Sequence, residues 1–158
     1  DYGYWYKNEF LFPDQMISVM VAITEETKEN GCLQVIKGSH KMGRVEHGFV
    51  GEQTGASQRY VDLALKTMEL VYVEIMPGDA LFFHSNLLHR SEANLSEAPR
   101  WSLISVYNRS KNISYNEPSQ SSTVPLQAVP DEALMEWKNE NIGEAAHFLE
   151  KEKDEALK

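Results

Sequence analysis

Residues 77–91 read PGDALFFHSNLLHRS, and this stretch decides the fold expected for the chain. Pro-Gly-Asp at 77–79 is typical of a tight turn. The apolar run at 80–84 indicates a short strand that ends at His84, and a second histidine, His89, stands five residues later. The stretch therefore predicts a strand that begins at a turn and ends in a histidine-containing loop.

Four more apolar runs of strand length flank this stretch, and each is bounded by turn or loop residues. They are residues 15–24 (QMISVMVAIT), 32–36 (CLQVI), 69–75 (ELVYVEI) and 101–107 (WSLISVY). We expect Glu-Asn-Gly at 29–31 to turn between the first two runs, which we predict to be neighbouring strands. Residues 37–56 are rich in Gly, His and Lys and indicate a loop, whereas residues 58–67 have the apolar spacing of a helix.

Short strands without alternating helices favour a mainly β fold, a sandwich or jelly roll, over a parallel α/β sheet. Pro-Asp-Glu at 130–132 opens a helix, with proline in the first turn and acids at the positive end of the helix dipole. Gly143 separates it from a second helix at 144–157. We therefore predict a β domain over residues 1–129 with peripheral helices, and a helical extension of the same domain over residues 130–158.

The composition excludes several classes of partner. The 158 residues carry 15 basic and 24 acidic side chains, and a net charge of −9 disfavours nucleic acid and anionic membrane surfaces. No apolar run approaches the ~20 residues of a membrane span. Cys32 is the only cysteine, which favours a reducing compartment. We expect a cytoplasmic protein, with a peroxisomal one as the alternative, that acts as a monomer or homodimer.

The two histidines cannot be separated on the residues alone. Side chains alternate along a strand, so His84 and His89 would point to opposite faces if the strand continued, and Asn86 indicates that it does not. A histidine after an apolar strand is more often a hydrogen-bonded structural residue than a metal ligand. Either role is open for both residues on this ground.

Three motifs occur together in this chain: DYGYWY at 1–6, NGCLQVIKGSHK at 30–41, and PGDALFFHSNLLHRS with an arginine after it. Over residues 1–108 this combination resembles the phytanoyl-CoA dioxygenase family of iron(II) and 2-oxoglutarate-dependent oxygenases, which includes ectoine hydroxylase. The resemblance implies a double-stranded β-helix, a cupin-like jelly roll. It also implies iron held by a His-x-Asp pair and a distant histidine.

Carried over by position, the resemblance implies that Asp1 and His89 are the iron ligands and that His84 is not. It implies that Arg100 binds the distal carboxylate of 2-oxoglutarate and that Ser91 and Ser102 help to hold this cosubstrate. A planar, permanently charged guanidinium suits this task because it can form paired hydrogen bonds with a carboxylate.

The aromatic residues after Asp1 are candidates for substrate contact. Trp5 matches a substrate-facing position of ectoine hydroxylase, and Tyr2 belongs to the same aromatic run after Asp1, so we assign both to substrate binding; a role in the core is the alternative for the group. The halogenating branch of these enzymes replaces the carboxylate ligand by a small residue. Asp1 therefore points to hydroxylation.

One ligand of the family pattern has no counterpart in the sequence. The first histidine would stand two residues before Asp1, so we expect the chain to be a fragment that lacks its N-terminal part. Two other hypotheses stay open: a non-catalytic jelly-roll binding module, or a cupin-type metalloenzyme that uses His40 or His47. The leading hypothesis is a dioxygenase that uses Fe(II), 2-oxoglutarate and O2 to hydroxylate an aliphatic carbon of a small molecule, releasing succinate and CO2.

Overall fold

The computed structural model describes residues 10–50, 53–115 and 123–133. The chain divides into two compact units, Asp1–Val124 and Pro125–Lys158. In the second unit, a helical turn begins after Pro130, whose carbonyl oxygen accepts a hydrogen bond from the N–H of Ala133 at 3.0 Å. The remainder of the predicted C-terminal helices lies outside the described residues, and the predicted boundary at residue 129 stays a prediction.

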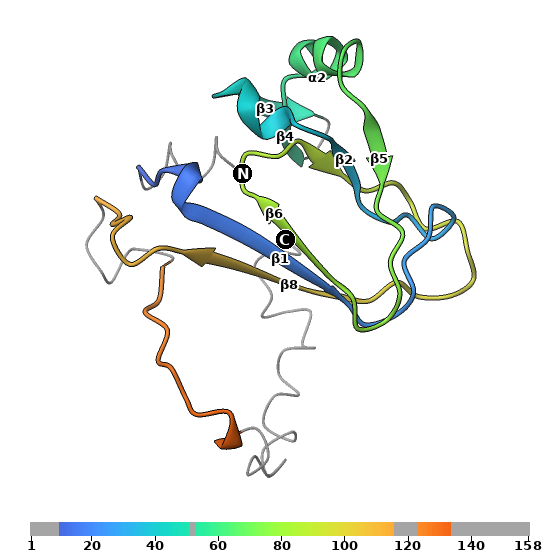
Figure 1. Ribbon diagram of the computed structural model, residues 1–158. Helices are drawn as coiled ribbons and strands as arrows, with labels where there is room; N and C mark the ends of the chain where they lie inside the picture. The colour runs from blue at the N-terminus through green and yellow to red at the C-terminus, as the bar shows by residue number, and fades with distance from the viewer. Residues whose placement is uncertain (1–9, 51–52, 116–122, 134–158) are drawn as a thin grey trace, which may run out of the picture. The chain divides into compact units, whose positions relative to one another are not determined.

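The first unit contains an antiparallel sheet in the strand order β6-β1-β8, whose strands run side by side in Figure 1. The bounds are Met16–Ala22 for β1, Ala80–His84 for β6 and Ser102–Asn108 for β8. Along β1, Ser18 and Met20 are buried and Ile17 is exposed, as expected for a strand with one covered face. Because paired residues share a face, Phe83, opposite Ser18, points inward, and His84, opposite Ile17, points outward.

A second antiparallel sheet has the order β5-β2-β7. Its strands are Gln34–Ile36 for β2, Leu70–Tyr72 for β5 and His89–Arg90 for β7. Val35 of the central strand stands opposite both Val71 and His89. All five predicted strands are therefore confirmed, and His89 lies in a strand of the other sheet from His84.

The prediction that the runs at 15–24 and 32–36 are neighbouring strands is wrong, because β1 and β2 belong to different sheets. The connection between them is held by its own contacts. The side chain of Asn30 accepts the N–H of Thr27 at 2.8 Å and donates to the carbonyl oxygen of Glu25 at 2.8 Å. Gly31 has a φ of 78°, a conformation that glycine adopts without strain. This structured loop carries the chain from one sheet to the other.

The hydrophobic core joins the inward faces of the two sheets. Its buried cluster is Met20, Leu33 and Phe83, and the partly buried residues packed against it are Val35, Val73, Ile75, Leu81 and Leu87. Burying side chains of this size contributes roughly 1.5–3 kcal/mol each. Since His89 shares the face of Val35, the core also determines where His89 points.

Part of the predicted loop at 37–56 is ordered as regular structure. It contains the 3-10 helix η2, Ser39–Met42, and a hairpin of β3, His47–Val50, with β4, Gln53–Ala56. Gly48 stands opposite Gly55 in this hairpin, and two facing glycines give little of the β-branched pattern that reveals a strand. The predicted helix is confirmed as α2, Gln58–Leu65.

The Pro-Gly-Asp turn is confirmed between β5 and β6. The N–H of Asp79 donates to the carbonyl oxygen of Met76 at 3.0 Å, and the N–H of Met76 donates to Oδ2 of Asp79 at 2.9 Å. Gly78 has a φ of 92°. Just before this turn, Ile75 forms an isolated antiparallel bridge with Glu26. No helix within the described ranges has the length and apolar character needed to cross a membrane.

Candidate functional site

His89 is held between the two sheets. Nδ1 lies 2.9 Å from the carbonyl oxygen of Leu87, and its ring packs edge-on against Phe83 with centroids 5.2 Å apart. A carbonyl oxygen only accepts, so Nδ1 carries the proton and donates. Burial lowers the pKa of His89 below its ordinary value of 6.5. The residue is therefore a neutral imidazole whose lone pair is on Nε2.

This arrangement fits a metal ligand. Metal-binding histidines coordinate through one neutral ring nitrogen and usually donate the other N–H to a carbonyl or carboxylate oxygen, which fixes the tautomer and the ring orientation. The carbonyl of Leu87 provides that acceptor for His89. Within the described residues, no group of three or more His, Cys, Asp or Glu side chains is placed to hold a metal ion. His89 is thus the described member of the predicted ligand set, and Asp1 lies outside the described residues.

Arg100 is paired with Glu26. Arg100 Nη1 donates to Glu26 Oε2 at 3.2 Å, the Arg100 side chain is 21% exposed, and Glu26 has no exposed surface. The two residues meet because the backbones around them run together: the N–H groups of Ile23 and Thr24 donate to the carbonyl oxygen of Trp101 at 2.9 and 3.2 Å. The predicted binder of an oxoacid is therefore already held by an internal carboxylate.

The two predicted cosubstrate serines have different environments. Ser102 is the first residue of β8 and pairs with the buried Ala22, so it lies on the inward face of its sheet. Ser91 follows β7 and is exposed. The predicted substrate residues Tyr2 and Trp5 lie outside the described residues.

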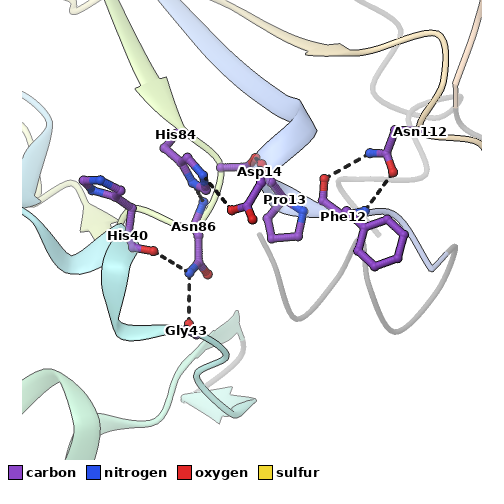
Figure 2. Close-up of polar contacts among 9 residues, drawn as sticks. Phe12, Pro13, Asp14, His40, Gly43, His84, Asn86 and Asn112 are labelled. Carbon is purple, nitrogen blue, oxygen red and sulfur yellow. Dashed lines mark hydrogen bonds and ion pairs between the residues drawn. The ribbon is translucent and has the colours of Figure 1, made fainter.

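His84 makes local contacts at the end of β6. Nε2 lies 3.2 Å from Asp14 Oδ1, and Nδ1 accepts the backbone N–H of Asn86 at 3.0 Å (Figure 2). The Asn86 side chain donates to the carbonyl oxygens of His40 and Gly43 at 3.0 and 2.9 Å. Asn86 thus ends the strand after His84 and fastens it to the segment around η2.

The histidines of the cupin-type alternative have other contacts. The His40 ring lies 5.3 Å from the His84 ring, centroid to centroid. Nδ1 of His47 is 2.8 Å from the carbonyl oxygen of Val45, and burial lowers the pKa of His47. Neither belongs to a group of three metal-binding side chains in the described part of the chain. The cupin-type reading stays a prediction.

An open cavity of about 350 Å³ lies beside His84. None of the predicted site residues lines it. Its lining residues are Asp14, Gln15, Met16, Ile17, Phe82, Phe83, His84 and Arg109.

Glu26 was not singled out by the sequence. It is the second of two adjacent glutamates in TEETKEN at 24–30, a stretch that has the composition of a solvated turn. Only the folded chain distinguishes them, because Glu25 is exposed and Glu26 is buried.

Known proteins match most of this chain. Residues 1–102 match the model of the family described as phytanoyl-CoA dioxygenase (PhyH). The dioxygenase lolE1 of Epichloe uncinata is 30% identical over 97 residues, which are 61% of this chain and 35% of that protein. Phytanoyl-CoA dioxygenase 1 of Oryza sativa subsp. japonica is 32% identical over 98 residues, 61% of this chain and 34% of that protein. The chain thus spans about a third of the length of these relatives.

A solved structure shares the fold of much of the chain. EctD from S. alaskensis, crystallised with 2-oxoglutarate and 5-hydroxyectoine, matches with a TM-score of 0.59 and 26% identity, over 71% of this chain and 37% of that one. The same protein with bound Fe gives the same TM-score and identity, over 71% of this chain and 38% of that one.

Proposed function

The chain belongs to the phytanoyl-CoA dioxygenase family, and from this premise we propose that it forms part of an iron(II) and 2-oxoglutarate-dependent dioxygenase. The proposed reaction is hydroxylation of an aliphatic carbon of a small molecule, with release of succinate and CO2. The likeness to EctD, crystallised with Fe in one structure and with 2-oxoglutarate and 5-hydroxyectoine in another, supports this proposal. The observation that carries it is His89, a partly buried neutral imidazole whose Nδ1 proton is already engaged by the carbonyl oxygen of Leu87.

The proposed fold is a double-stranded β-helix to which residues 1–129 contribute, with residues 130–158 as an extension. Two three-stranded antiparallel sheets with a shared core support it, as does the TM-score of 0.59 with EctD. In such a fold the inward faces of the two sheets line the active site. His89 on one inward face and Ser102 on the other agree with this arrangement.

His89 and Asp1 would hold the iron in this proposal, together with a histidine two residues before Asp1. When bound, the iron would supply oxygen activation coupled to decarboxylation of the oxoacid. The protein would contribute position and protection from water. The Leu87 carbonyl keeps the His89 ring in one tautomer, and the Phe83 ring covers one edge of the imidazole.

Arg100 would bind the distal carboxylate of 2-oxoglutarate, assisted by Ser102 and Ser91. A guanidinium that is mostly covered by protein binds a carboxylate more strongly than one in water, because the local dielectric constant is lower. Arg100, with a side chain 21% exposed, meets this condition. Trp5 and Tyr2 would contact the primary substrate, which we assign only to the class of small molecules.

Succinate formation by the intact protein, supplied with iron(II), 2-oxoglutarate and candidate substrates, tests this function. We expect His89→Ala to abolish turnover and Arg100→Ala to raise the KM for 2-oxoglutarate strongly. His84→Ala is the matched control, since His84 faces outward, and its turnover should stay close to that of the wild type. If His89→Ala and Arg100→Ala both turn over like the wild type, the proposed site is wrong.

A further inference from the structure

The ion pair between Glu26 and Arg100 is unusual because its carboxylate is fully buried and only one of the two carboxylate oxygens is bonded. Glu26 is fully buried, and Arg100 Nη1 bonds only one of its carboxylate oxygens, Oε2. The other oxygen, Oε1, is the one buried side-chain polar atom without a hydrogen-bond partner among the described residues. Burying a carboxylate is costly unless it is paired. Since Arg100 is the described polar partner of this side chain, the pairing with Arg100 accounts for its burial.

The backbone holds Glu26 firmly in place. Its N–H donates to the carbonyl oxygen of Ile75 at 2.9 Å, and the N–H of Ile75 donates back at 3.1 Å. Two residues earlier, Oγ1 of Thr24 accepts the N–H of Trp101 at 2.9 Å, which ties the same segment to the residue after Arg100. The carboxylate and the guanidinium are thus presented to each other by paired backbones, so their relative position is set by the fold.

The guanidinium has unused bonding capacity. An arginine side chain has five N–H donors arranged as a planar fork. In the described part of the chain, Arg100 uses one nitrogen, Nη1, toward Glu26, and neither Nε nor Nη2 has a protein partner there. A planar guanidinium that is held through one nitrogen keeps its remaining N–H donors in a defined direction. This is the arrangement needed to bind a second carboxylate without first ordering a flexible side chain.

We propose that Glu26 is a positioning residue for Arg100: it fixes the guanidinium through Nη1 and so prepares the remaining donors for the distal carboxylate of the oxoacid. This inference rests on the proposed function, which assigns that carboxylate to Arg100. Glu26 acts through its acceptor oxygen, and its negative charge does not aid the dicarboxylate, because two carboxylates on one guanidinium repel each other. Glutamine, which keeps an acceptor oxygen and removes the charge, should therefore replace it.

The test is an anaerobic calorimetric titration of the iron(II)-loaded intact protein with two oxoacids of equal chain length. 2-Oxoglutarate has the distal carboxylate and 2-oxopentanoate lacks it. We expect Glu26→Ala to raise the Kd for 2-oxoglutarate about tenfold, the loss of roughly one charge-assisted hydrogen bond, and to leave the Kd for 2-oxopentanoate unchanged. Glu26→Gln, which keeps the acceptor oxygen and removes the repelling charge, should bind 2-oxoglutarate at least as tightly as the wild type and should leave the Kd for 2-oxopentanoate unchanged. Glu25→Ala removes the same charge from the exposed neighbouring position and should change neither value.

The alternative outcomes separate the two proposals. Equal weakening of both oxoacids in Glu26→Ala shows a general structural role and overturns the positioning role, as does an unchanged Kd for 2-oxoglutarate. If Glu26→Ala does not fold, Glu26→Asp takes its place, because the shorter side chain withdraws the carboxylate from Nη1 and should cause the same selective loss. A wild-type protein that binds 2-oxoglutarate no better than 2-oxopentanoate overturns the proposed function itself.

Discussion

The rings of Phe83 and His89 meet edge to face, at 63° and 5.2 Å between centroids, although Phe83 belongs to β6 and His89 to β7 of the other sheet. Phe83 is also a member of the buried cluster. The imidazole therefore lies against the core, and the core shields part of it from water. Its protonation and its position both depend on how tightly the two sheets pack.

The stability of the fold should depend on pH near neutrality. Burial lowers the pKa of His89 and of His47 below 6.5, so the unfolded chain binds more protons than the folded one as the pH falls below the unfolded value. The free energy of unfolding therefore falls as the pH drops through about 6.5, until each folded pKa is reached. Urea unfolding at about pH 7.5 and about pH 5.5 measures this loss.

Replacing both partly buried histidines isolates their contribution. The double variant His47→Gln/His89→Gln has no imidazole to protonate at these sites, so its stability should change less over the same interval than that of the wild type. An equal loss in the variant and the wild type would assign the pH dependence to other groups.

Iron binding should distinguish the two histidines of the FFHSNLLH motif. His89→Gln removes a proposed ligand, and its iron(II) affinity should fall by more than the roughly 10–100-fold that loss of an outer-shell partner costs. His84→Gln, at a position bonded to Asp14 and Asn86, should keep the wild-type affinity. Competition with a chelator under anaerobic conditions gives both values. Comparable losses in the two variants would contradict the assignment of His89.

Breaking the Glu26–Arg100 pair from the arginine side should destabilise the protein. Arg100→Met leaves the fully buried carboxylate of Glu26 without its cation, which costs about 3–5 kcal/mol in comparable pairs. The double variant Glu26→Gln/Arg100→Met no longer buries a charge and should regain most of this loss. Arg109→Met, at an exposed arginine, is the control. Equal destabilisation of the single and double variants would show that lost packing, and not the buried charge, causes the effect.

Asn112 should be important for stability although it lies outside the proposed site. It is buried, its side chain exchanges two 3.0 Å hydrogen bonds with the backbone of Phe12, and it donates to Asn108 Oδ1 at 2.7 Å. Asn112→Ala leaves these groups unpaired, and we expect a loss of about 2–3 kcal/mol in denaturant unfolding. Asn94→Ala, at an exposed asparagine that bonds the Ala98 carbonyl, should cost less than about 1 kcal/mol. Similar losses at both positions would contradict this role.

The positions of the strands formed by apolar runs were predictable from the sequence, but their sheet partners were not. The runs that became β1, β2, β5, β6 and β8 are apolar and rich in β-branched or aromatic residues, and this local property predicts extended backbone wherever the strand pairs. Whether β2 lies beside β1 depends on the loop between them, where Asn30 and Gly31 order a crossing instead of a hairpin. The β3-β4 hairpin was missed because its paired glycines carry no strand signal.

The sequence names candidate site residues only where a motif marks them. His89 and Arg100 stand at fixed places in a family pattern, and the structure adds the Leu87 carbonyl and the Glu26 carboxylate that hold them. Glu26 could not be predicted because its burial results from tertiary packing against Ile75 and Arg100, residues distant in sequence. The site roles assigned to all seven residues stay predictions: Asp1, Tyr2, Trp5, His89, Ser91, Arg100 and Ser102.

Gly31 leaves no room for a side chain, because an added Cβ would collide with the carbonyl oxygen of Glu92 and approach that of Ala93 to 3.1 Å. Leu95 also donates its N–H to the Glu29 carbonyl oxygen at 3.1 Å. The linker from β7 to β8 is thus held near its middle by contacts with the loop around Gly31. Insertions designed to reshape this linker should be tolerated between Leu95 and Arg100, downstream of these contacts. Insertions placed upstream of the contacts should displace β7.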